Sequence, residues 1–187
     1  MKAQPLVGGS TLNYIMNLSS IITGVPEYIE YGWVTAPNAA GQSIAANTIT
    51  TLTIDTAVSA TAIAGTYSSI ASNQITLSAG TYYFEASVST RQNSYATVGS
   101  GLLSLYNISD SSYITRGRIW DNYAGYPYSS YGTIKGQFAI TSQKIFALRI
   151  LTTLACTVDN GASDAALSTL STAGADQRTT IKLWKLK

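Results

Sequence analysis

A strict alternation of apolar and polar side chains between Ile75 and Thr90 constrains the fold more than any other stretch of the chain. Ile75 and Leu77 alternate with small hydroxyl residues before a short break at Ala79-Gly80. In the longer run that follows, the apolar positions are Tyr82, Phe84, Ala86 and Val88. Such a period of two predicts an antiparallel strand with one buried and one wet face, because a strand covered on both faces would be apolar throughout. Glu85 marks the wet face.

Similar patterns recur along the chain between turn residues. The other predicted strands are Glu30–Thr35, Thr48–Ala57 (with a bulge near Thr50 or Thr51), Gly101–Ile108, Tyr113–Trp120, Thr133–Ile140, Lys144–Thr152 and Arg178–Leu186. Residues 36–47, 58–73 and 156–176 are expected to be loops, and residues 141–143 a tight hairpin. Eight or nine strands with almost no helix predict an all-β antiparallel sandwich or jelly roll.

The segment Leu77-x-Ala79-Gly80-Thr81-Tyr82-Tyr83-Phe84-x-Ala86 resembles the second-to-third strand hairpin of the C1q/TNF-like jelly rolls, a fold common in bacteriophage structural proteins. An Asn-containing lead-in at residues 46–49, a Gly-x-Phe strand at 135–140 and a terminal strand at 180–183 fit the same pattern. The resemblance covers roughly residues 31–187. It implies a homotrimer, in which aromatic residues near the axis fill the subunit interface. Function must be argued separately, because one fold hosts many functions.

Residues 1–30 lie outside this resemblance and are expected to form an arm or anchor, with residues 31–187 as the jelly-roll domain. The candidate anchor residues, at partly helical spacing, are Leu12, Ile15, Met16 and Ile22. Gly24 and Pro26 would end such a helix. The intervening Asn and Ser residues are poor helix formers, so an extended arm is the alternative. The segment either docks onto another protein or packs back on its own domain.

The surface is expected to be poor in charge and rich in hydroxyl groups. Charged residues make up only 11% of the chain, less than half the usual share, while tyrosines number 13. This composition suits a protein whose surface is largely covered by neighbours, or a very stable extracellular protein. The net charge of +2 and the scattered basic residues argue against a nucleic-acid partner.

The chain also lacks the apolar run of a signal peptide or a membrane helix. We therefore expect no membrane insertion, synthesis in a host cytoplasm, and exit from the cell only as part of a particle.

No set of residues for catalysis, metal binding or cofactor binding is evident. The absence of His removes the commonest general base and metal ligand. Cys156 is the only cysteine, which excludes an intrachain disulfide, and it is expected to be a small hydrophobe in or beside a strand. The nine acidic residues form no paired motif, and Asp159-Asn160-Gly161 is a turn signal that lacks the repeated acids of a calcium loop. We expect no enzyme and no cofactor.

The loop Asp121–Tyr131 has the most unusual composition, and its candidate site residues are Tyr123, Tyr126, Tyr128 and Tyr131. Tyrosine presents a flat apolar face and a hydroxyl group, which suits recognition of sugars or protein surfaces. The family resemblance instead implies a place in the trimer interface. Packing within the chain is a third interpretation.

Two groups of basic residues receive structural interpretations. Arg116-Gly117-Arg118 with Trp120 could form a stacking patch for nucleic acid, but an exposed strand face or an intersubunit pair is the preferred interpretation. The alternation of Lys182, Lys185 and Lys187 with apolar residues predicts the solvent side of an edge or closing strand.

Together these features suggest a non-enzymatic, homotrimeric virion protein, such as a phage decoration, spike or fibre component. Its expected partners are further copies of itself, capsid or tail proteins, and a host-surface glycan or protein bound by its loops. One alternative is a carbohydrate-binding module of a bacterial surface or secreted system, with the Tyr-rich loop as its site. A second is a glycan-cleaving tailspike, which would need two apposed carboxylates.

Overall fold

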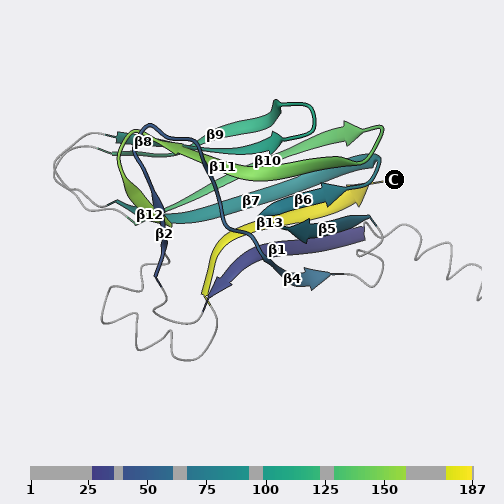
Figure 1. Cartoon of the computed structure of the whole chain (residues 1–187), viewed down its shortest axis with the longest axis horizontal. Helices are drawn as coiled ribbons and strands as arrows, with labels where there is room; N and C mark the ends of the chain where they lie inside the picture. The colour runs from purple at the N-terminus through teal and green to yellow at the C-terminus, as the bar shows by residue number, and fades with distance from the viewer. Residues whose placement is uncertain are drawn as a thin grey trace, which may run out of the picture.

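The computed structural model describes residues 27–35, 40–60, 67–92, 99–122, 129–158 and 176–186, and these residues form strands, turns and links without a helix. The strands are β1 (Glu27–Thr35), β2 (Gln42–Ile44), β3 (Thr50–Thr51), β4 (Thr56–Ala60), β5 (Ser68–Ala71), β6 (Gln74–Leu77), β7 (Gly80–Gln92), β8 (Gly99–Asn107), β9 (Ser112–Asn122), β10 (Ser129–Ile140), β11 (Lys144–Thr152), β12 (Cys156–Val158) and β13 (Asp176–Leu186). Figure 1 shows the long strands lying side by side, with β13 beside β1.

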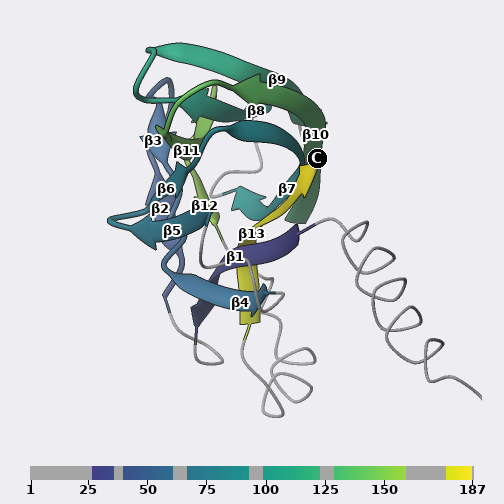
Figure 2. The same cartoon turned by 90° about the vertical axis from the view of Figure 1, so that its right-hand side faces the viewer.

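The strands form two antiparallel sheets. Sheet A has the order β2-β12-β7-β13-β1-β4. β12 and β13 pair with different parts of one edge of β7, and β10 pairs with its opposite edge. Sheet B has the order β5-β6-β11-β8-β9, with β3 also paired to β11. Figure 2 shows the two sheets curving around a common interior.

The connectivity is that of a jelly roll. The main ladder of sheet A is β1-β13-β7-β10 and that of sheet B is β6-β11-β8-β9, so successive strands alternate between the sheets and the first strand pairs with the last. The exception to the alternation is the β8–β9 hairpin, whose two strands both lie in sheet B. Two interleaved four-stranded sheets of this kind form the double-sheet jelly roll. The predicted all-β antiparallel jelly-roll sandwich is therefore confirmed.

Aromatic and aliphatic side chains from both sheets meet in the core. Tyr82, Phe84, Ala86 and Val88 of β7 are each at most 1% exposed, as their alternation predicted. Phe138 of β10 lies with its ring 5.6 Å from that of Tyr82 and 5.2 Å from that of Phe146 on β11 in sheet B. Rings spaced this way contribute about 0.5–1.5 kcal/mol per pair beyond their buried area, so this cluster helps to join the sheets.

Two predicted hairpins are sheet-to-sheet corners instead. The chain crosses from β6 in sheet B to β7 in sheet A at Ser78-Ala79, and from β10 back to β11 at residues 141–143. Both edges of β7 are occupied by β10 and β13, so β6 pairs with β5 and β11 instead. The Tyr82 hydroxyl donates to the Ser78 carbonyl oxygen (2.8 Å) and ties the first corner.

The region between β1 and β6 also differs from the prediction. Thr48–Ala57 is not one strand: β3 lies in sheet B and β4 in sheet A, and the chain crosses between them with Leu52 and Ile54 fully buried. The segments expected to be loops contain β2 and β5. β5 and β6 form a hairpin whose turn residues, Ser72 and Asn73, both have positive φ (52° and 62°), as a two-residue type I′ turn requires.

The first and last strands, β1 and β13, both lie in sheet A. β1 begins at Glu27, three residues before the predicted strand. Of the two predicted places for Lys182 and Lys185, an edge strand or a closing strand, the edge strand is wrong, because β13 is the last strand of the chain and lies between β7 and β1. β13 pairs with β1 on one edge and with β7 on the other. The alternating pattern within one strand does not show which strands pair with it. Lys187 lies outside the described residues.

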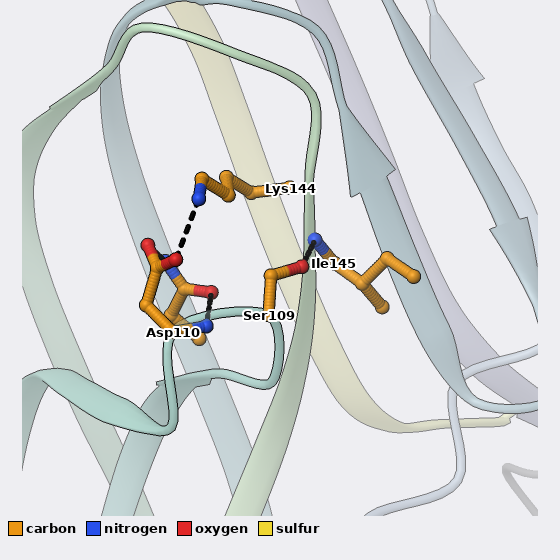
Figure 3. Close-up of polar contacts among 5 residues, drawn as sticks. Ser109, Asp110, Lys144 and Ile145 are labelled. Carbon is orange, nitrogen blue, oxygen red and sulfur yellow. Dashed lines mark hydrogen bonds and ion pairs between the residues drawn. The ribbon is translucent and has the colours of Figure 1, made fainter.

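The turn between β8 and β9 is fixed to the start of β11 (Figure 3). Asp110 forms an ion pair with Lys144 (2.5 Å), and the Ile145 backbone N–H donates to the Ser109 hydroxyl (2.9 Å). Asn107 donates its side-chain amide to Asp110 (2.9 Å) and accepts from the Asp110 backbone N–H (3.1 Å). These contacts hold the end of β8 and β9 in register with β11.

Among the described residues there is no helix long and apolar enough to cross a membrane.

Candidate functional site

Of the predicted site residues, Tyr131 is the one that lies among the described residues. It lies in β10 rather than in a loop, because that strand begins at Ser129, and its side chain is 72% exposed on the face of sheet A that points away from the core. Its neighbours Gly132 and Ile134 are buried, as the alternation of a strand with one core face requires. Tyr131 is one of three large hydrophobic side chains that are exposed among the described residues.

A shallow hollow with a volume of about 60 Å³ lies beside Tyr131 on this outer face. Its lining residues come from three adjacent strands: Glu85, Ala86 and Ser87 of β7, Tyr131 and Thr133 of β10, and Thr180 and Lys182 of β13. The hollow is far below the usual range of roughly 300–1,000 Å³ for ligand pockets. Its size suits at most one small side chain.

Charges of alternating sign cross the same face in one row. In register, Glu30 of β1 lies opposite Lys182 of β13, Lys182 opposite Glu85 of β7, and Glu85 opposite Lys135 of β10. Opposite charges on directly neighbouring strands stabilise a sheet modestly, by about 0.2–1 kcal/mol per pair. Glu30 is only 9% exposed, so Lys182, Glu85 and Lys135 carry the charge that this row presents at the surface.

An aromatic row lies next to the charged row. Trp184 of β13 sits between Tyr28 of β1 and Tyr83 of β7, with ring centroids 5.2 Å and 5.5 Å apart. Each tyrosine hydroxyl donates to the glutamate two residues further along its strand, Tyr28 to Glu30 (2.7 Å) and Tyr83 to Glu85 (2.8 Å). Desolvation and the bond to Glu30 raise the pKa of Tyr28, and the bond to Glu85 raises the pKa of Tyr83. The two rows are thus coupled, and the glutamates are oriented by their phenols.

A third row carries hydroxyl groups at the floor of the hollow. The hydroxyls of Ser87 and Thr180 are hydrogen-bonded at 2.7 Å, and Thr133 is the register partner of Ser87 on the other side. These groups can donate or accept. The outer face of β1, β13, β7 and β10 therefore presents aromatic, charged and hydroxyl rows in order, with the Tyr131 ring at its far end. We call this surface the sheet A face.

The remaining predicted site residues are not placed by the structure. Tyr123, Tyr126 and Tyr128 lie outside the described residues, as do the candidate anchor residues Leu12, Ile15, Met16 and Ile22. Asp159-Asn160-Gly161 lies outside them too. Within the described part of the chain, no three potential metal ligands of the Asp, Glu, Cys and His types come together.

The other singled-out residues have structural places. Arg116 and Arg118 are exposed in β9, as predicted for a strand face, whereas Trp120 is nearly buried (9%) against Gly101. Cys156 is fully buried in β12, which confirms its prediction as a small hydrophobe. Burial raises the pKa of its thiol.

The sequence alone did not predict the sheet A face. Alternation placed Glu85 on a wet face correctly, but Glu30, Lys182 and Trp184 become its neighbours only through pairings of strands that are far apart in the sequence. The signal available beforehand was local: a Tyr-x-Glu sequence occurs in both Tyr28–Glu30 and Tyr83–Glu85.

Comparisons with known proteins show a distant structural likeness. No family model matches the chain, and no curated protein matches it. Among solved structures, the chain is similar to the crystal structure of murine APRIL, with a TM-score of 0.44 and 12% sequence identity. The match covers 86% of this chain and 98% of that chain. A likeness this distant carries no argument about binding or assembly, and the jelly roll assigned above rests on strand order.

Proposed function

We propose that this chain is a non-enzymatic structural protein of a virion, a phage decoration, spike or fibre component, which assembles as a homotrimer through the sheet A face. The observation that carries the assembly is the 72% exposed ring of Tyr131 beside a hollow of side-chain size on the same face. The virion setting is supported by the resemblance of the segment 77–86 to phage jelly rolls and by the charge-poor composition.

Covering Tyr131 would supply part of the assembly energy. Removing one such ring from water is worth about 2 kcal/mol, and a closed trimer would bury three of them. Tyrosine and tryptophan are enriched in the cores of protein interfaces, where their flat rings pack at low entropic cost. The partly buried Trp184, Tyr28 and Tyr83 row offers a further apolar surface beside the hollow.

The charged row would orient the subunits. The alternating charges of Lys182, Glu85 and Lys135 can match a second copy in few registers, because a shifted register places like charges together. Such a pattern contributes specificity more than affinity. Trimerisation itself is proposed on the family resemblance.

The N-terminal residues would connect the trimer to the particle. In this proposal Leu12, Ile15, Met16 and Ile22 dock onto a capsid or tail protein, while the jelly roll projects outward and its loops contact a host-surface glycan or protein. For the experiment the chain is divided before Glu27, the first residue of β1.

The test compares the full chain with a chain that lacks residues 1–26 and retains β1. Each is added to purified particles that lack this protein, and the bound fraction is measured after sedimentation. We expect only the full chain to sediment with the particles. Equal binding of both chains would refute the anchor, and binding of neither would refute the virion assignment.

A carbohydrate-binding module is the second candidate. The observation that favours it is the lining of the hollow, where an exposed ring stands among hydroxyl, carboxylate and amine groups that can hydrogen-bond a sugar. It predicts that Tyr131→Ala abolishes binding on an array of neutral glycans while the native mass stays that of the wild type. The assembly proposal predicts that the same substitution changes the native mass.

A further inference from the structure

A cluster of arginines and tyrosines covers the outer face of sheet B, on the opposite side of the sandwich from the sheet A face. Arg149 of β11 and Arg116 of β9 are both register partners of Ser104, which lies between them on β8. Tyr106 of β8 and Tyr113 of β9 are register partners one step further along. We call these four side chains, Arg149, Tyr106, Tyr113 and Arg116, the Arg-Tyr cluster.

Stacking holds the two guanidinium groups in place. The Arg149 guanidinium carbon lies 3.6 Å from the centroid of the Tyr106 ring, and that of Arg116 lies 4.8 Å from the centroid of the Tyr113 ring. The two rings pack edge to face with centroids 4.9 Å apart. A guanidinium in contact with a ring face keeps its N–H donors available around its edge, so the groups are preorganised for an anion.

These donors have no acidic partner in the described structure. Neither guanidinium has a hydrogen bond or ion pair to another described residue, although Arg149 is only half-exposed. Of the acidic side chains that the structure describes, Glu27, Glu30 and Glu85 belong to sheet A and Asp55 precedes β4, while Asp110 is paired with Lys144. The Arg-Tyr cluster therefore differs from the sheet A face, whose charges alternate in sign.

The geometry points to an acidic polysaccharide as the ligand, and we propose that the Arg-Tyr cluster binds a chain of uronic acid units. Tyr113 is 39% exposed, so part of its side chain can contact a sugar beside the Arg116 guanidinium. Arg116 and Arg149 offer forked donors that match a carboxylate bidentately. Because β8 separates them, their strands are about 10 Å apart, so one chain can place a carboxylate on each.

A polysaccharide fits better than an acidic peptide because the cluster lies on strand faces. A peptide segment would need either a sheet edge to pair with or pockets for its side chains. Both edges of β8 and β11 are paired, and β9 is the strand at the end of sheet B. This inference rests on the proposed function only in expecting that the protein meets host glycans. Binding of the polysaccharide does not require a trimer.

The test is calorimetric titration of the full chain with oligogalacturonate, beside a neutral malto-oligosaccharide and poly-glutamate. We expect oligogalacturonate alone to bind, with an affinity that falls as salt is added. Arg149→Gln and Arg116→Gln should each weaken binding by roughly tenfold, since each removes a charge-assisted contact. Arg149→Lys should lose part of the affinity, because an ammonium group keeps the charge without the planar fork. Lys144→Gln, which removes a charge from the same sheet outside the cluster, should bind like the wild type.

Three outcomes would overturn the inference: no binding of oligogalacturonate by the wild type, equal weakening by Lys144→Gln and the arginine variants, or poly-glutamate binding as tight as that of the uronate. Near-UV circular dichroism of each variant reports whether it folds, and Arg149→Lys remains informative if Arg149→Gln does not. The native mass of the same samples separates the two proposals. If the protein is a monomer that binds the uronate, only the assembly proposal is refuted. If it is a trimer that does not bind the uronate, only this inference is refuted.

Discussion

At the residue scale, Tyr67 is the buried phenol whose environment is least favourable. Its side chain is 3% exposed, and its hydroxyl finds no hydrogen-bond partner among the described residues. Its ring packs against the Tyr82 ring, with centroids 6.1 Å apart, and against the Lys185 ammonium, 5.4 Å from its centroid. The ring therefore stabilises the core while the hydroxyl costs free energy of desolvation.

Tyr67→Phe should consequently leave the free energy of unfolding unchanged or raise it by up to about 1 kcal/mol. The matched control is Tyr82→Phe, which loses the bond to the Ser78 carbonyl oxygen (2.8 Å) and should lower it by about 1 kcal/mol. Urea unfolding of the three proteins measures both effects. A larger loss for Tyr67→Phe than for Tyr82→Phe would show that the Tyr67 hydroxyl is bonded after all.

At the scale of elements, close approach of β9 to β10 depends on glycine. A Cβ added at Gly132 of β10 would lie 2.1 Å from the Cβ of Ile119 and 3.1 Å from its Cα, so the backbone itself would have to shift. At Gly117 of β9 an added Cβ would lie 2.6 Å from the Cγ2 methyl of Ile134 and 3.8 Å from its Cβ. The clash thus involves backbone at Gly132 and side-chain atoms alone at Gly117.

Gly132→Ala should lower the free energy of unfolding by about 1–3 kcal/mol, the usual cost of overpacking, and more than Gly117→Ala does. Gln137→Ala, at an exposed position of the same strand, is the control and should change stability by less than about 0.5 kcal/mol. Thermal or urea unfolding distinguishes them. The proposed packing of β9 against β10 fails if Gly132→Ala is as stable as the control.

Sequence periodicity predicted the long strands well and the connections poorly. The alternation of Tyr82 to Val88 fixed which face of β7 is buried, because a period of two has only two phases. Short links such as Ser78-Ala79 were mistaken for hairpins, since a local pattern does not say whether the next strand stays in the same sheet. The β5–β6 hairpin was missed because Ser72-Asn73 is a weaker turn signal than Asn-Gly.

The candidate site was less predictable than the fold for the same reason. Tyr131 could be singled out by composition, but its role depends on neighbours in β7 and β13, such as Glu85 and Lys182, which only tertiary pairing supplies. The Arg-Tyr cluster is similar: Arg116 was noticed in the sequence, whereas Arg149 and Tyr106 join it across strands.

At the scale of the whole molecule, buried phenols make stability depend on alkaline pH. Burial raises the pKa of Tyr31, Tyr67 and Tyr82 in the folded state, while phenols of the unfolded chain ionise near about 10. The folded protein therefore holds these protons more tightly than the unfolded chain. Their contribution to stability is complete below pH about 10 and is lost as the pH rises through the folded pKa values.

The free energy of unfolding in urea should accordingly fall steadily from about pH 10 upward. Absorbance of tyrosinate should show these phenols ionising only as the protein unfolds. Tyr67→Phe should give a shallower decline, which separates the phenol effect from the neutralisation of lysines. A pH-independent stability between about pH 10 and 12 would contradict the burial of these hydroxyls.

Assembly through the sheet A face is the central claim, and the native mass of the full chain over a range of concentrations tests it most directly. We predict three copies for the wild type and a loss of the trimer in Tyr131→Glu, which would bury a charge in the interface. Tyr113→Glu makes the same change on the outer face of sheet B and should remain a trimer. A monomeric wild type would contradict the account, and a Tyr131→Glu trimer as stable as that of the wild type would remove the sheet A face from the interface.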